Sequence, residues 1–178
     1  MKKLHAAGIG LVAFTGLGLL IEPGVPSTAF AAQGEAVKGK IVNMKPERSC
    51  MTVGGERVCN IVIKGVGISD QGEVINRDIV AMTKSAGTKS AGKQADTRAI
   101  DSFAIWTYPD GSAMMLKSKG ESKVDADGQR TISGTQVCVG GTGKFAGAEC
   151  TIDWSHSPQA NGLYAGTYSG TVNLASGS

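Results

Sequence analysis

Residues 103–119 read FAIWTYPDGSAMMLKSK, the pattern of two strands joined by a tight turn. Pro109 presets the backbone angle φ early in the turn, and Gly111 supplies the positive φ that closes it. Aromatic and aliphatic residues, which favour strands, flank the turn on both sides. The segment therefore predicts an antiparallel hairpin with strands at 103–108 and 112–119.

Most of the chain after residue 32 has the same character, and no apolar period of 3.6 residues is sustained there. We expect about eight or nine strands joined by short turns, although Asn76-Arg77-Asp78 interrupts one of them. Closing so many antiparallel strands into a ring removes their edges, so the sequence predicts an all-β, single eight-stranded barrel. The expected strands are 36–44, 49–53, 57–66, 73–83, 103–108, 112–119, 130–139, 150–155 and 163–174.

A perfect duplication separates two of these strands. The pentapeptide Thr-Lys-Ser-Ala-Gly occurs at 83–87 and again at 88–92. Small polar residues bury too little surface to order themselves, so we expect a mobile loop over 83–97.

The amino-terminal segment has the features of a secretory signal peptide. Lys2 and Lys3 precede an uncharged apolar stretch at 6–21 that contains four glycines. A membrane-spanning helix needs about 20 mostly apolar residues without such breakers, so a retained membrane anchor is the weaker interpretation.

The small residues Ala29 and Ala31 suit a signal peptidase, which places the cleavage before Ala32. We therefore expect a signal peptide at 1–31 and one barrel domain at 32–178. The sequence predicts an exported protein, periplasmic or extracellular, with no stable membrane anchor after cleavage.

Four cysteines follow, an even number in a chain expected to meet an oxidising compartment. Gly54-Gly55 is a two-residue hairpin turn whose register sets Cys50 directly opposite Cys59, where a disulfide can form. Cys138 and Cys150 then pair by elimination. The spacings of the four cysteines are not those of a zinc site, and His156 is the only histidine that remains after cleavage of the signal peptide. We therefore expect neither a metal nor a cofactor.

The formal charge is only +3, from 18 basic and 15 acidic residues. A protein that binds nucleic acid through a basic surface has a larger excess, so this class of partner is not expected.

Residues 137–148 read VCVGGTGKFAGA, and this stretch resembles the strand-turn-strand signature of the allene oxide cyclase and dirigent superfamily. The likeness extends over about 130–172. It implies a small calycin-like barrel of eight antiparallel strands, and such barrels often form homo-oligomers.

At position 150, where the family pattern often has glycine, this chain has Cys150. The cysteine suggests that a disulfide clamps this turn covalently. A phosphate-binding loop is not expected because Lys144 is followed by Phe145, which could instead plug one end of the barrel.

The resemblance also implies a cavity that holds a reactive hydrophobic intermediate and steers its cyclisation or coupling. No catalytic residue of the family can be matched here. From the residues alone, five side chains are candidates for lining a ligand pocket, with core packing as the alternative for the aromatic ones. Asp153 and Trp154 point to opposite faces of a strand, so at most one of them can face the cavity. For Asp153, a solvated position on the outer face is the favoured alternative. We expect His156 in a surface loop. The candidates are Trp106, Asp153, Trp154, Tyr164 and Tyr168.

Three functions remain open from the sequence. The first is an exported barrel that binds a small hydrophobic ligand in its cavity. The second is an enzyme of the cyclase or dirigent type, which would place a buried ionisable Asp or Glu in the same cavity. The third is a filled barrel that acts through its outer surface. The sequence does not decide whether the protein is an enzyme.

Overall fold

The computed structural model describes residues 34–85 and 97–175, which form nine strands and one short 3₁₀ helix. The expected signal peptide at 1–31 and the greater part of the expected loop at 83–97 lie outside these residues. The elements are β1 (Glu35–Asn43), β2 (Glu47–Val53), β3 (Glu56–Ser69), β4 (Val74–Ser85), β5 (Arg98–Thr107), β6 (Ala113–Val124), β7 (Arg130–Thr142), η1 (Gly143–Phe145), β8 (Glu149–Pro158) and β9 (Tyr164–Asn173).

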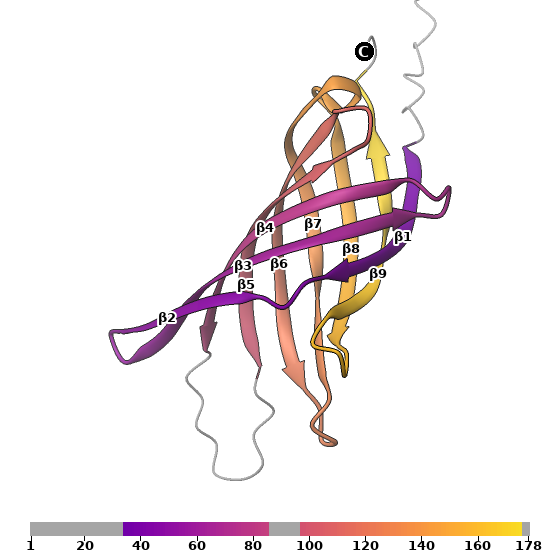
Figure 1. The fold of residues 1–178 in the computed structure, drawn as a ribbon. Coiled ribbons are helices and arrows are strands. Elements are labelled where there is room, and N and C mark those ends of the chain that lie inside the picture. Colours follow the sequence, from indigo (N-terminus) through magenta and orange to yellow (C-terminus); the bar gives the residue numbers. More distant parts are fainter. Residues whose placement is uncertain (1–33, 86–96, 176–178) are drawn as a thin grey trace, which may run out of the picture. The chain divides into compact units, whose positions relative to one another are not determined.

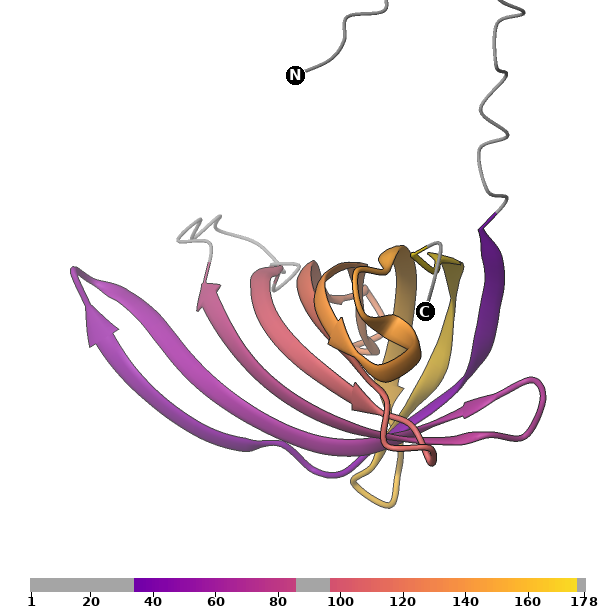
Figure 2. The ribbon, with the colours of Figure 1, turned by 90° about the horizontal axis from the view of Figure 1, so that it is seen from above.

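Eight strands close into an antiparallel barrel. Each strand from β3 to β9 pairs with the next, β9 pairs with β1, and β1 pairs back with β3 to complete the ring. β2 pairs only with β3 and lies outside the ring (Figures 1 and 2). This confirms the predicted all-β, eight-stranded antiparallel barrel. The proline-glycine turn also joins β5 to β6 as expected, with Gly111 at a φ of 81°.

Successive residues of each strand face alternately into the barrel and out of it, as strand geometry requires. In β4, Ile75, Arg77, Ile79 and Ala81 are buried while the residues between them are exposed. The expected interruption at Asn76-Arg77-Asp78 is therefore wrong, because Arg77 continues the inward series. β4 also runs on to Ser85, so the expectation of a loop is wrong for residues 83–85.

The first two strands run along the same neighbour, β3, with a bulge between them. Asn43 lies opposite Gly65 and Glu47 opposite Val62, so four steps along one chain match three along the other. Such an extra residue bends a strand away from its partner. The ladder between β1 and β9 ends where Asn43 lies opposite Tyr164, the first residue of β9. β2 lies past this point and forms no backbone pairing with β9.

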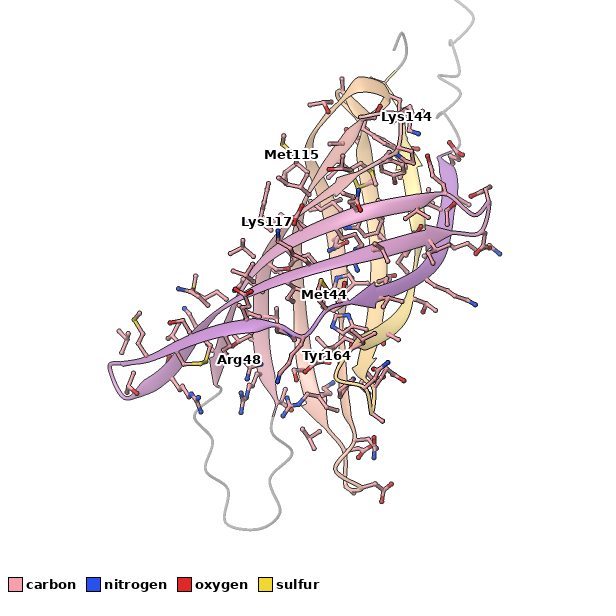
Figure 3. All side chains as sticks on the ribbon, viewed as in Figure 1. Met44, Arg48, Met115, Lys117, Lys144 and Tyr164 are labelled. Atoms are coloured by element: carbon pink, nitrogen blue, oxygen red, sulfur yellow. A yellow bond between two sulfur atoms is a disulfide. The ribbon has the colours of Figure 1, made fainter. Side chains whose placement is uncertain are left out.

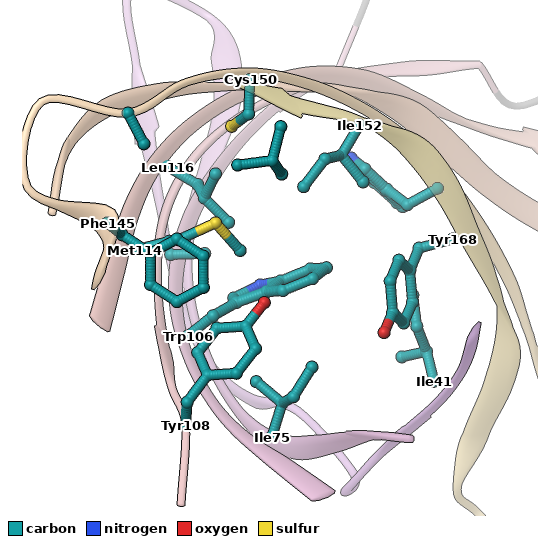
Figure 4. Close-up of a cluster of buried hydrophobic side chains, with 14 of the residues drawn as sticks. Ile41, Ile75, Trp106, Tyr108, Met114, Leu116, Phe145, Cys150, Ile152 and Tyr168 are labelled. Carbon is teal, nitrogen blue, oxygen red and sulfur yellow. The ribbon is translucent and has the colours of Figure 1, made fainter. Parts of the chain in front are cut away.

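The end of the barrel that carries η1, here called the η1 end, is filled by side chains (Figure 4). Phe145 from η1 packs against Tyr108 with ring centroids 4.5 Å apart, and Trp106 meets Tyr168 edge to face at 4.9 Å. Phe145 is only 6% exposed, as expected for an apolar plug. The core cluster comprises chiefly Ile41, Ile75, Ile79, Ala104, Trp106, Tyr108, Met114, Leu116, Phe145, Ile152, Trp154, Tyr168 and Val172.

Two disulfides join the predicted cysteine pairs. Cys50 lies opposite Cys59 across the β2–β3 hairpin, where Gly54 and Gly55 both have positive φ. Cys138 and Cys150 connect β7 to β8 and enclose the segment that carries η1. Cys150 belongs to the main core cluster, whereas Cys59 belongs to a smaller one beside it.

Removal of the second disulfide should weaken the barrel more than removal of the first. We expect the double change Cys138→Ala and Cys150→Ala to lower the free energy of unfolding by about 2–4 kcal/mol. The matched change Cys50→Ala and Cys59→Ala should cost less, because it frees a hairpin whose outer strand lies outside the ring. Denaturant unfolding of both variants measures the difference, and equal losses would contradict the expectation.

Candidate functional site

The half of the barrel opposite the η1 end contains a cavity of about 60 Å³. It opens to solvent at a mouth where Pro46 and Arg48 follow the bulge on one side and Tyr164 begins β9 on the other. Figure 3 shows Arg48 and Tyr164 together at this position, away from Lys144 at the η1 end. We call this space the mouth cavity. It is lined by Asn43, Pro46, Arg48, Ile61, Ile63, Arg77, Ile79, Ala81, Thr83, Ile100, Ser102, Ile132, Gln136, Trp154, His156 and Tyr164.

Two glycines make room for the largest side chain of the lining. Gly120 on β6 lies opposite Gly134 on β7, and a Cβ atom at either position would come within 3.0 Å of the Trp154 ring. The indole therefore lies against bare backbone. Its Nε1 donates a hydrogen bond to Ser118 Oγ at 3.0 Å, which fixes the plane of the ring beside the cavity.

Arg77 is the charged side chain of the cavity interior. It is 2% exposed, and its Nη1 donates a hydrogen bond to Asn43 Oδ1 at 2.9 Å. Gly65 lies between these two residues in the ladder, with Asn43 on one side and Arg77 on the other. Because Gly65 has no side chain, the asparagine and the arginine can meet across it.

The guanidinium of Arg77 also lies over the ring of Trp106, its cross-strand neighbour, with the central carbon 4.9 Å from the ring centroid. Burial lowers the pKa of Arg77 to about 10, so the group still carries its charge at neutral pH. Among the described residues, no ion pair with a carboxylate offsets this charge.

His156 lies inside the barrel, so the expected surface-loop position is wrong. It is 7% exposed, stacks on Trp154 at 5.2 Å and meets the edge of Tyr164 at 5.8 Å. Burial, and then the nearby positive charge of Arg77, lower the pKa of His156 to about 4. The imidazole is therefore neutral at pH 7.

Four lining residues hold a buried polar atom without a hydrogen-bond partner in the described protein. Such atoms are uncommon because each loses its contact with water without compensation. Their gathering in one cavity identifies a site with unused hydrogen-bonding capacity. The atoms are Asn43 Nδ2, Arg77 Nε, Gln136 Oε1 and His156 Nδ1.

A second hollow of about 140 Å³ lies at the η1 end, over the packed aromatic layer. Its rim is polar and ion-paired: Lys144 Nζ lies 3.1 Å from Asp110 and 3.7 Å from Glu73, and also over the ring of Tyr108. None of the described residues around this hollow has a buried polar atom without a partner, whereas four residues of the mouth cavity do. The mouth cavity is therefore the better candidate site.

The five residues that the sequence suggested as pocket lining divide between several places. Trp154 and Tyr164 line the mouth cavity, and Trp106 lies in the core under Arg77. Tyr168 packs in the core and borders the hollow at the η1 end. Asp153 is exposed on the outer face, where its carboxylate accepts a hydrogen bond from Thr135 Oγ1, so the suggestion that it lines the pocket is wrong.

Sequence reasoning missed Arg77, Asn43 and Gln136. A usable signal was present in the alternation of β4, where Ile75, Arg77 and Ile79 recur at every second position. His156 continues the inward series of Ile152 and Trp154 in the same way. A polar residue in register with buried apolar ones is the pattern that would have found them.

In residues 34–85 and 97–175, no group of three or more His, Cys, Asp or Glu side chains is arranged to hold a metal ion. The described residues also include no helix with the length and hydropathy that a membrane span requires. No protein-family model matches the chain, and neither a curated protein nor a solved structure matches it significantly.

Burial of His156 should make the fold sensitive to mild acid. Its folded-state pKa of about 4 lies below the ordinary value of 6.5, so the unfolded chain binds the proton first. Stability is full above pH 6.5 and falls as the pH drops toward 4, by up to about 3 kcal/mol. Unfolding curves across this range should show the loss in the parent protein and a smaller slope in His156→Gln; equal slopes would refute the assignment.

Proposed function

We propose that the protein binds a small hydrophobic ligand in the mouth cavity. The observation that carries the proposal is a cavity open at one end of a barrel whose other end is plugged by Phe145. An eight-stranded barrel is just wide enough to hold one small ligand. Aliphatic side chains make up much of the wall: Ile61, Ile63, Ile79, Ala81, Ile100 and Ile132.

The size of the cavity favours a small or slender ligand. Its volume of about 60 Å³ is below the several hundred Å³ usual for drug-sized molecules. A bound molecule would therefore place one end inside the barrel and extend toward the mouth between Arg48 and Tyr164. Because strands rather than loops form most of the wall, the cavity is preformed and little ordering is required on binding.

The same proposal includes export. Two disulfides fit an oxidising environment, and the amino-terminal sequence has the pattern of a cleaved signal peptide. A barrel of this kind would meet its ligand in the periplasm or outside the cell.

A second candidate is an enzyme of the cyclase or dirigent type, the class that the sequence at 137–148 resembles. The observation in its favour is His156, a neutral and inward-facing imidazole whose Nδ1 has no protein partner. The buried acidic residue expected for such an enzyme does not occur among the described residues. We therefore place binding before catalysis; turnover of a bound ligand that His156→Gln abolishes would reverse the order.

Linear alcohols test the proposed site. The two tryptophans of the chain, Trp106 and Trp154, both lie inside the barrel, so tryptophan fluorescence should report on occupancy. Affinity for butan-1-ol to octan-1-ol should rise about threefold to fourfold per methylene while the chain fills the apolar wall. Native mass spectrometry of the purified protein can also detect a ligand carried through purification.

A matched pair of variants locates the binding. Ala81 is buried and lines the cavity, whereas Ala99 on β5 is exposed. Ala81→Leu should fill the cavity and weaken octan-1-ol binding at least about tenfold, while Ala99→Leu should leave it unchanged. Equal behaviour of the two variants, or no alcohol binding by the parent protein, would count against the proposed function.

A further inference from the structure

We propose that the mouth cavity selects an amphipathic monocarboxylate, whose carboxylate pairs with Arg77 while its apolar part lies along the isoleucine wall. This inference rests on the proposed function, because it names the class of ligand for the same cavity. The starting point is a positive charge inside a barrel that supplies it with no negative partner.

The surroundings of Arg77 differ from those of two lysines that form ion pairs. Lys38 pairs with Asp70 at 2.9 Å, and Lys144 pairs with Asp110, in both cases at exposed or partly exposed positions. Arg77 is buried, and the lining of the mouth cavity contains neither aspartate nor glutamate. A buried charge without a counter-charge is strongly unfavourable, so an anion that enters the cavity gains an interaction that the protein alone does not provide.

The hydrogen-bond donors around Arg77 suit a carboxylate. Within the described residues the guanidinium makes one hydrogen bond, from Nη1 to Asn43 Oδ1, which leaves Nε unpartnered. The amide Nδ2 of Asn43 is a second buried donor without a partner. Arginine binds carboxylates through two parallel N–H groups, and the Nε–H of Arg77 has no acceptor within the described protein.

Two contacts hold the guanidinium in position without neutralising it. The bond to Asn43 fixes one end of the group, and stacking over Trp106 fixes its plane. Attraction between a cation and an aromatic face is weaker than pairing with a carboxylate in the same buried setting. The group is therefore oriented in advance for a ligand that brings the negative charge.

The remaining lining narrows the class of anion. His156 is neutral at pH 7, so Arg77 is the one charged group of the described cavity interior, and it balances one negative charge. A monocarboxylate leaves this pair neutral, whereas a phosphate dianion would bring a second, unbalanced charge. Arg48 at the mouth adds positive potential along the entry path.

Octanoate and octan-1-ol, which have the same chain length and differ in charge, provide the test. We expect octanoate to bind the full chain, produced under oxidising conditions, about tenfold to a hundredfold more tightly than octan-1-ol. Tryptophan fluorescence and the rise in thermal midpoint on adding each compound give two independent readouts. Inorganic phosphate should neither bind in this range nor displace octanoate.

The variant Arg77→Gln removes the charge and keeps a polar side chain with an amide donor. It should lose the preference for octanoate and retain octan-1-ol binding, which also shows that the barrel is folded. The control Lys117→Gln removes one positive charge from the exposed outer face of β6 and should leave both affinities unchanged. Equal loss of octanoate binding in the two variants would overturn the role of Arg77.

The outcomes separate the two proposals. If octan-1-ol binds the parent protein as tightly as octanoate does, the cavity is a binding site and the monocarboxylate inference fails. If neither compound binds, both proposals fail. If Arg77→Gln does not fold, the preference of the parent protein decides alone, and a preference of less than about threefold overturns the inference.

Discussion

One edge of β3 pairs with both β1 and β2, and the rest of the barrel depends on this shared edge. One half of β3 pairs with β1 and closes the ring, while the other half pairs with β2, which β9 does not reach. The bulge between Asn43 and Glu47 separates these two halves. As a result the η1 end has a complete ring of hydrogen-bonded strands around a packed aromatic core, and the other end has an opening bordered by Arg48 and Tyr164.

The two ends of the barrel also differ in chemistry. At the η1 end, aromatic and aliphatic side chains fill the interior, and Lys144 is paired with acidic groups at the surface. At the mouth end, buried polar groups such as Arg77 and His156 face a cavity in which some of their hydrogen-bonding atoms have no partner. A buried cation of this kind lowers the stability of the fold. A site that gives up stability in this way is typical of binding and catalytic positions, where the ligand supplies the missing interaction.

Much of the fold could be predicted because it depends on local signals. Gly111 in the turn after Pro109 and the two glycines of the Gly54-Gly55 turn have positive φ, as expected. The Gly54-Gly55 turn sets the register that pairs Cys50 with Cys59. Local reasoning failed where a polar residue interrupted an apolar series. Because polar side chains are usually solvated, the sequence predicts a break in the strand at Arg77 and a loop position for His156. Both residues are instead buried, in register with isoleucine or tryptophan.

The class of fold, the number of strands to within one and the pairing of Cys50 with Cys59 follow from the sequence, because alternation, turn residues and hairpin register act over a few neighbouring positions. The pairing of Cys138 with Cys150 then follows by elimination. Which side chains meet inside the closed ring depends on the tertiary structure, since strands distant in sequence share the barrel interior. The tertiary structure thus joined Asn43 to Arg77 across Gly65 and set Trp154 against Gly120 and Gly134.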